Sequence, residues 1–172
     1  MTGPRASTAR RALACRRGSA AVEMALVTPM LLILVCGAAD LGNYFLSEHA
    51  VANGVRDGAR YASRSYPVGC TAVADDTGTV ATATKYLVRT NSIDGTGAAR
   101  LVGWTDNGTI KVSVACNTGS SYAGGIYAGS NAGVPVVTVT ATVSYTSLFK
   151  AFGLTTRTIN LNASAQAAVV GA

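Results

Sequence analysis

The sequence predicts an α+β fold, in which a long N-terminal helix packs on a roughly four-stranded antiparallel sheet and a second, short helix accompanies it. Residues 19–65 keep a helical spacing of apolar side chains from an apolar run into an amphipathic stretch. From residue 101 onward, apolar and polar residues alternate in short segments, as in strands with one buried face. With 172 residues, the chain has room for one small domain beyond the apolar run.

The first segment, residues 1–18, is a basic leader that holds five arginines and no acidic residue. In the rest of the chain nine basic side chains face eight acidic ones, so the formal net charge of +6 comes mostly from the leader. This distribution argues against nucleic-acid binding, which needs basic residues on a folded surface. Basic residues beside an apolar segment instead keep their side of it in the cytoplasm. The arginines nearest the apolar run are Arg10, Arg11, Arg16 and Arg17.

Residues 19–40 are expected to form a transmembrane helix. Residues 24–39 carry no charge but cover only about 24 Å as a helix, so a hydrocarbon core of about 30 Å also needs the residues before them. Pro29 lies inside the run, where membrane helices tolerate proline. Glu23 lies at the start of the run, and a carboxylate in hydrocarbon is costly unless it is compensated.

Cleavage of the chain after Gly18 would supply that compensation. Ser19 would become the N-terminus and carry an α-ammonium, and its spacing of four residues from Glu23 places both groups on one helix face. Glu23 can offset this ammonium or that of a neighbouring subunit, and near the new helix start the dipole favours a negative charge. The alternative role for Glu23 is that of an interfacial side chain which reaches the headgroups.

Two other fates of the N-terminus remain open. Residues 1–39 also resemble a secretory signal peptide, with the small residues 37–39 before Asp40. Cleavage near Ala39 would release an extracytoplasmic binding module. A chain that is not cut at all would stay anchored with Met1 as its N-terminus.

Residues 41–65 are expected to form the outer half of the long helix. Three rows run along it at helical spacing: an apolar stripe that would cover the sheet, a row of small residues and a row of arginines expected to be solvated. The small row suits close approach of another backbone, or packing on the protein's own sheet. The apolar stripe is Leu41, Tyr44, Phe45, Val51, Ala52, Val55, Ala59 and Ala62; the small row is Ala50, Gly54, Gly58 and Ala62; the arginines are Arg56, Arg60 and Arg64.

Residues 17–29 (RGSAAVEMALVTP), 40–42 (DLG) and 55–62 (VRDGARYA) resemble the TadE-like pseudopilins of tight-adherence (Flp-type) pili. The resemblance implies a pilin-like fold and a non-enzymatic component required for assembly, initiation or anchoring of a type IVb pilus. It implies cleavage by a prepilin peptidase between Gly18 and Ser19, with Glu23 as the acidic residue at mature position five. Met24 departs from the aromatic residue often found next in the family. The implied partners are the bacterial inner membrane, the peptidase and other pilus subunits.

Residues 66–172 are expected to form the extracytoplasmic α+β domain. A second helix is predicted over residues 77–90, capped by residues 75–77, and residues 91–98 form a loop. Its expected inner face is Val80, Ala83, Leu87 and Val88.

Four strands are predicted over residues 101–104, 110–116, 137–145 and 159–167. The first two are joined across an Asn-Gly hairpin signal at residues 107–108. Trp104 is expected to pack in the core or at the sheet edge.

The four cysteines suggest one disulfide. Cys15 belongs to the leader and Cys36 to the membrane span, which leaves Cys70 and Cys116 outside the membrane. Two such cysteines should pair in an oxidising compartment. A metal site is not expected, because His49 is the only histidine.

Residues 117–133 form a long loop rich in Gly, Ser and Asn, for which adhesion is a hypothesis. The sequence carries no HExxH, GxSxG or GxxxxGK motif, so no enzyme activity, cofactor or small-molecule substrate is expected.

Overall fold

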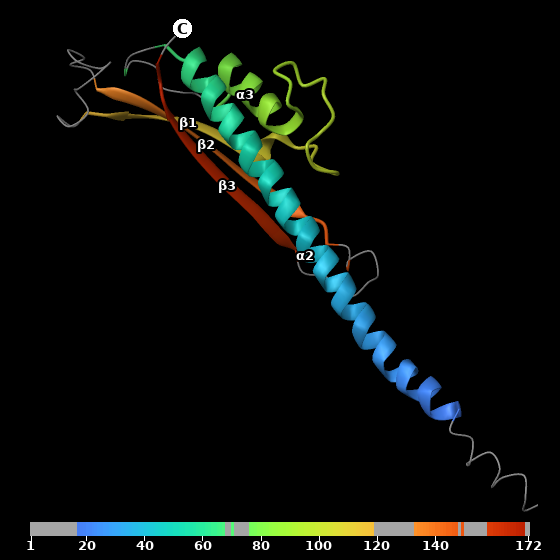
Figure 1. Ribbon diagram of the computed structural model, residues 1–172. Coiled ribbons are helices and arrows are strands. Elements are labelled where there is room, and N and C mark those ends of the chain that lie inside the picture. Colours follow the sequence, from blue (N-terminus) through green and yellow to red (C-terminus); the bar gives the residue numbers. More distant parts are fainter. Residues whose placement is uncertain are drawn as a thin grey trace, which may run out of the picture. The chain divides into compact units, whose positions relative to one another are not determined.

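The computed structural model describes residues 17–67, 70, 76–118, 133–147, 149 and 158–170, with side chains from residue 20 onward. Its elements are the helices α2 (Arg17–Ser65) and α3 (Thr79–Thr90), the 3₁₀ turn η1 (Asn107–Thr109), and the strands β1 (Ile110–Asn117), β2 (Val134–Tyr145) and β3 (Ile159–Ala168) (Figure 1). The expected α+β fold is confirmed. The chain divides into two compact units, Met1–Gly42 and Asn43–Ala172, and α2 contributes to both.

In the second unit, the strands form an antiparallel sheet in the order β1-β2-β3. Val139, in the middle of β2, lies between Val112 of β1 and Ala165 of β3. Because side chains alternate along a strand, one face of the sheet gathers the apolar residues. That face contributes Ile110, Val112, Val137, Val139, Ala141, Val143 and Leu161 to the buried core.

The described residues contain three strands rather than the roughly four expected. Residues 101–104 form a turn, in which Gly103 adopts φ +83° and the Trp104 N–H donates to the Leu101 carbonyl at 3.2 Å. The prediction of a hairpin at the Asn-Gly pair is also wrong, because residues 107–109 form η1. The Asp106 carboxylate accepts the Gly108 N–H at 2.7 Å. Such local bonds between side chain and backbone compete with strand pairing.

Residues 43–65 of α2 lie over the sheet beside α3 (Figure 1). Val51, Val55, Ala59 and Ala62 are buried at helical spacing, so this part of the expected apolar stripe forms the core contact. The three arginines at 56, 60 and 64 are exposed, as expected of a solvated row.

Two of the small residues of α2, Gly54 and Gly58, face α3. A Cβ at Gly58 would overlap the Val88 side chain, and a Cβ at Gly54 would lie 2.6 Å from the Val88 carbonyl oxygen. Glycine at these two positions therefore allows the helices to approach closely, and the neighbour of both glycines is α3 of the same domain.

The second helix begins two residues later than predicted and turns a different face inward. Gly78 is its N-cap and supplies no side-chain bond, so the predicted cap over residues 75–77 is wrong. Thr84 is buried although it is polar, because its hydroxyl donates to the Val80 carbonyl at 2.7 Å. Of the predicted inner face only Val88 is fully buried, since the close contact with α2 sets the rotation of the helix. The buried residues are Ala81, Thr84, Val88 and Thr90.

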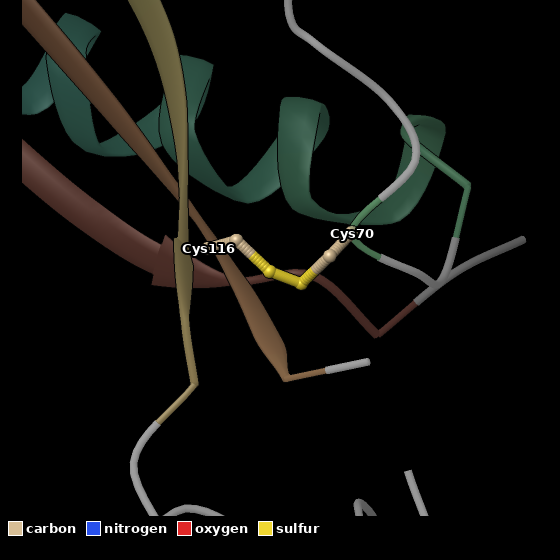
Figure 2. Close-up of a disulfide and its surroundings, with 2 residues drawn as sticks. All are labelled: Cys70 and Cys116. Atoms are coloured by element: carbon tan, nitrogen blue, oxygen red, sulfur yellow. A yellow bond between two sulfur atoms is a disulfide. The ribbon is translucent and has the colours of Figure 1, made fainter. Parts of the chain in front are cut away.

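A disulfide joins Cys70 to Cys116 near the end of β1, with a Cα–Cα distance of 5.6 Å (Figure 2). It links the segment after α2 to the sheet, which is the pairing expected from the sequence. A closed loop with a separation of 46 residues stabilises the fold by about 4 kcal/mol in the chain-entropy treatment. Cys36 is free and exposed.

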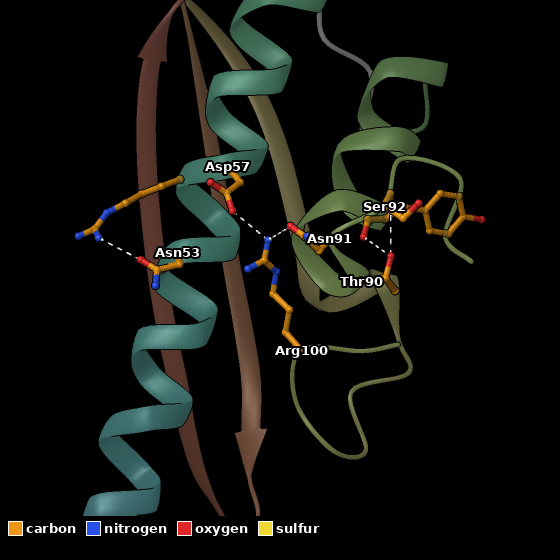
Figure 3. A network of polar contacts seen from close by, with 8 residues as sticks. Asn53, Asp57, Thr90, Asn91, Ser92 and Arg100 are labelled. Atoms are coloured by element: carbon orange, nitrogen blue, oxygen red, sulfur yellow. Dashed lines mark hydrogen bonds and ion pairs between the residues drawn. The ribbon is translucent and has the colours of Figure 1, made fainter. Parts of the chain in front are cut away.

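A polar network ties α2 to the segment after α3 (Figure 3). The Arg100 guanidinium lies between two oxygens, 2.9 Å from the Asp57 carboxylate and 2.7 Å from the Asn91 side-chain oxygen. Asn91 ends α3 in the left-handed conformation, with φ 61°. Arg100 therefore fixes the exit of α3 against α2.

Candidate membrane and processing segment

Among the described residues of the first unit, the apolar surface of α2 has no packing partner. Each large apolar side chain between Val22 and Val35 is at least 53% exposed. An 18-residue window of α2 reaches a mean hydropathy of 2.1, and this helix is long and apolar enough to cross a membrane. A helix that is apolar all round needs cover on every side, which lipid supplies.

Two features inside this segment bear on its backbone hydrogen bonds. Pro29 has no N–H, so the carbonyl four residues earlier loses its usual donor, yet α2 continues through it. The Thr28 hydroxyl donates to the Met24 carbonyl at 2.6 Å. The Thr28 hydroxyl therefore has a hydrogen-bond acceptor within the helix, which lowers the free-energy cost of placing this polar group in hydrocarbon.

The predicted processing residues lie at the start of α2. Gly18 and Ser19 belong to its first turn, and Glu23 follows one turn after Ser19 with an exposed side chain. Within the described part of the chain, Glu23 forms no ion pair. The described part of α2 begins at Arg17 and has no acidic residue in its first turn, so Glu23 lies beyond the turn in which the helix dipole acts most strongly.

The arginines at 10, 11 and 16 and Cys15 lie outside the described residues, as does most of the loop considered for adhesion. His49 is exposed on α2. In the described ranges, no group of three or more His, Cys, Asp or Glu residues is placed to hold a metal ion.

The start of α2 is also where the chain matches a known family. A family model described as TadE-like protein matches residues 18–60. Residues 18–60 are TadE-like. The TadE-like segment begins at Gly18 and lies wholly within α2, so the resemblance seen in the sequence is confirmed there. It implies a role in a tight-adherence pilus system. No curated protein and no solved structure matches the chain.

Sequence reasoning did not find the role of Asp76. Burial raises the pKa of this carboxyl, but the Val112 N–H, which donates to it at 2.8 Å, and Lys85 at 3.0 Å outweigh that effect and lower the pKa below its usual value. Asp76 thereby accepts a hydrogen bond from a backbone N–H of β1, and its ion pair with Lys85 links β1 to α3. No local signal marks this contact, because Asp76 and Val112 are 36 residues apart.

A pocket of about 350 Å³ was also not foreseen. It lies between the 101–103 turn, the end of β2 and the start of the second unit on α2. Its lining includes Asn43, Ser47, Val102 and Tyr145. The sequence pattern predicted a strand over residues 101–104, so the turn that lines one side of this pocket was not expected.

Proposed function

We propose that this protein is a pseudopilin-like component of a tight-adherence type IVb (Flp) pilus and acts in its assembly, initiation or anchoring. It spans the bacterial inner membrane once, with the leader in the cytoplasm and the α+β domain outside. A prepilin peptidase matures it after Gly18. The observation that carries this proposal is the family match, which starts at Gly18 and continues through the apolar helix.

The chemistry of the segment supports this maturation. Gly18 offers a peptide bond with no side chain before it, and the leader arginines hold that bond on the cytoplasmic side. Cleavage converts Ser19 into an ammonium four residues from Glu23. Glu23 is exposed and unpaired among the described residues, so it is open to this ammonium or to that of a neighbouring subunit.

The first test is Gly18→Leu in the native host, with the mature N-terminus read by mass spectrometry. The wild-type chain should begin at Ser19, and the variant should stay at precursor mass and form no pili. Gly37→Leu is the matched control, because nothing lies within 4 Å of a Cβ there, and it should be cut normally. A wild-type chain that begins at Asp40 or Met1 would establish one of the alternatives instead.

The charge role is tested by Glu23→Gln. This variant should still be cut after Gly18 but should assemble few pili, because the new ammonium loses its partner in hydrocarbon. Glu48→Gln, at an exposed acidic residue of the same helix, is the control and should leave piliation unchanged. Normal piliation of Glu23→Gln would remove the charge pairing from the mechanism.

A further inference from the structure

The two edge strands of the sheet differ in what covers their outer sides. In the order β1-β2-β3, both β1 and β3 have one side without a neighbouring strand. At β1, the Asp76 carboxylate accepts the Val112 N–H, and the disulfide at Cys116 joins the segment after α2 to the same strand. α3 also contacts β1. The β1 edge is therefore partly closed, whereas β3 forms the opposite edge of the sheet (Figure 1).

The backbone groups of β3 alternate between β2 and the open side. Just beyond the strand, the Val169 N–H donates to the Pro135 carbonyl of β2 at 2.9 Å. The next N–H, that of Val170, donates to the Ser63 carbonyl of α2 at 3.0 Å. Because neighbouring residues of a strand direct their N–H and C=O to opposite sides, odd-numbered residues face β2 and even-numbered residues face away. The register runs without a bulge over residues 159–168, so this alternation holds along the whole strand.

The other edge of the sheet gives the same assignment. The Val112 N–H points away from β2, so Val112 and Val139 form a pair without hydrogen bonds between them. The N–H and C=O of Val139 then face Ala165, its odd-numbered partner in β3. The residues of β3 that direct these groups to the open side are Asn160, Asn162, Ser164, Gln166 and Ala168, and their side chains are exposed.

The open side of β3 lacks the features that usually keep strand edges from pairing. Such edges are protected by charged side chains, prolines, bulges or a covering segment. Residues 158–172 contain no charged residue and no proline. Within the described ranges, no hydrogen bond from outside the sheet reaches the backbone of residues 159–168, and the bond to Ser63 comes only after the strand has ended. The edge is therefore able to pair with another strand.

β2 shows which kind of strand fits beside β3. Its side chains alternate between Thr or Ser on one face of the sheet and Val or Ala on the buried face. A strand on the open side would meet the same two rows of β3. These rows are Asn162, Ser164 and Gln166 on the exposed face, and the half-buried Ala163, Ala165 and Ala167 on the other. A charged side chain would find no opposite charge there, whereas valine-like side chains could pack beside the small alanines.

We propose that the open side of β3 binds an extended, uncharged segment of another protein as a fourth, antiparallel strand. The segment pairs with residues 160–168 over about 30 Å and alternates hydroxyl or amide side chains with valine-like ones, as β2 does. Main-chain hydrogen bonds supply its affinity, and the two side-chain rows select its sequence. This inference goes beyond the proposed pilus role and concerns the second unit alone.

The test uses the full chain in detergent micelles and a synthetic peptide with the sequence of residues 137–145, VTVTATVSY, capped at both ends and carrying a neutral polyethylene glycol tail. Amide hydrogen exchange is followed by NMR. Without peptide, the N–H groups at 162, 164 and 166 should exchange fast, while those at 163 and 165 are protected by β2. Saturating peptide should slow exchange at the three even positions by at least about tenfold and leave the odd positions unchanged.

Two variants change the edge itself. Ser164→Pro removes the central outward N–H but no bond to β2, and Ser164→Lys adds a protecting charge. Each should weaken peptide binding, measured by fluorescence anisotropy of a labelled peptide, by at least about tenfold. Ser113→Lys, at an exposed serine of β1, is the matched control and should bind as the wild type does. If Ser164→Pro fails to fold, the comparison of the two lysine variants decides.

Absence of binding, equal binding by Ser164→Lys and Ser113→Lys, or protection that ignores the alternation would overturn the proposal. Slow exchange at 162, 164 and 166 without peptide would overturn it as well. If that protection grew with protein concentration, a second copy would be the occupant, and if it did not, the chain would close its own edge.

Discussion

The two parts of α2 differ in what covers their apolar side chains. Residues 24–35 carry no charge and each large apolar side chain among them is exposed, whereas residues 51–62 bury one stripe and leave only Asn53, Arg56 and Arg60 fully exposed. The glycines follow the same division. Nothing lies within 4 Å of a Cβ at Gly37 or Gly42, but Gly54 and Gly58 touch α3 closely. One continuous helix thus depends on an outside medium in its first part and on its own domain in its second.

The strongest test of this difference places the same charge in both parts. Val55→Asp puts a carboxylate into the core at a fully buried position and should destabilise the domain by about 4 kcal/mol or more. Leu34→Asp should leave domain unfolding unchanged but raise the cost of membrane insertion by about 3 kcal/mol. Denaturant unfolding of the full chain in detergent, followed by Trp104 fluorescence, measures the first effect, and the membrane-bound fraction after alkaline extraction measures the second.

The two readouts should separate cleanly. If Leu34→Asp lowered the unfolding midpoint as much as Val55→Asp, residues 20–35 would belong to the folded core, and the division of α2 would be wrong. Thr142→Asp, on the exposed face of β2, controls for the added charge and should change neither readout.

A smaller change in domain stability is expected to distinguish the glycines in the two parts of α2. Gly54→Ala sets a methyl group 2.6 Å from the Val88 carbonyl oxygen and 3.3 Å from the Arg100 side chain, so the helices must move apart at a cost of about 1–3 kcal/mol. Gly37→Ala meets nothing and should leave domain unfolding unchanged. The same fluorescence-detected denaturation compares the two variants.

Gly58→Ala sharpens this comparison, because its obstacle is the Val88 side chain rather than backbone. Adding Val88→Ala should relieve part of the loss at Gly58 but none of that at Gly54. Equal relief at both positions would mean that the helix contact is looser than the structure shows.

Much of α2 was predictable because its signals are local. The spacing of Gly18, Ser19 and Glu23 and the change from an all-round apolar run to a stripe containing Val55 are properties of neighbouring residues on one helix. The match to the TadE-like family lies on the same helix. The apolar helix and the TadE-like segment could therefore be located from the sequence, while what covers the apolar surface depends on a medium outside the chain.

The errors lie where distant residues decide the local structure. The segment around Val102 has the composition of a strand, but Gly103 and the buried Trp104 close it into a turn beside α2. Asp76 was placed in a helix cap, but its carboxylate serves Val112 of β1.

The smallest predicted effect concerns the ion pairs. All those among the described residues lie within the second unit, so their loss should affect the unfolding of that unit alone. The folded chain lowers the pKa of Asp76, so the folded state binds its proton less readily than the unfolded chain, where the pKa is about 3.9. The stabilisation by Asp76 is therefore fully present above about pH 4 and is lost as the pH falls through the folded pKa. Asp76→Asn keeps an oxygen for the Val112 N–H but loses the charge beside Lys85, which should cost less than about 1 kcal/mol at pH 7.

Thermal unfolding of both proteins between pH 3 and pH 7 measures this effect. The wild-type melting temperature should fall more steeply toward pH 3 than that of Asp76→Asn, so the two curves should converge in acid. Glu23→Gln should reproduce the wild-type curve, because Glu23 lies on the exposed part of α2 and takes no part in the domain. Parallel curves for wild type and Asp76→Asn would show that the carboxylate does not couple β1 to α3, whereas a flattened curve for Glu23→Gln would show that the two parts of α2 are not independent.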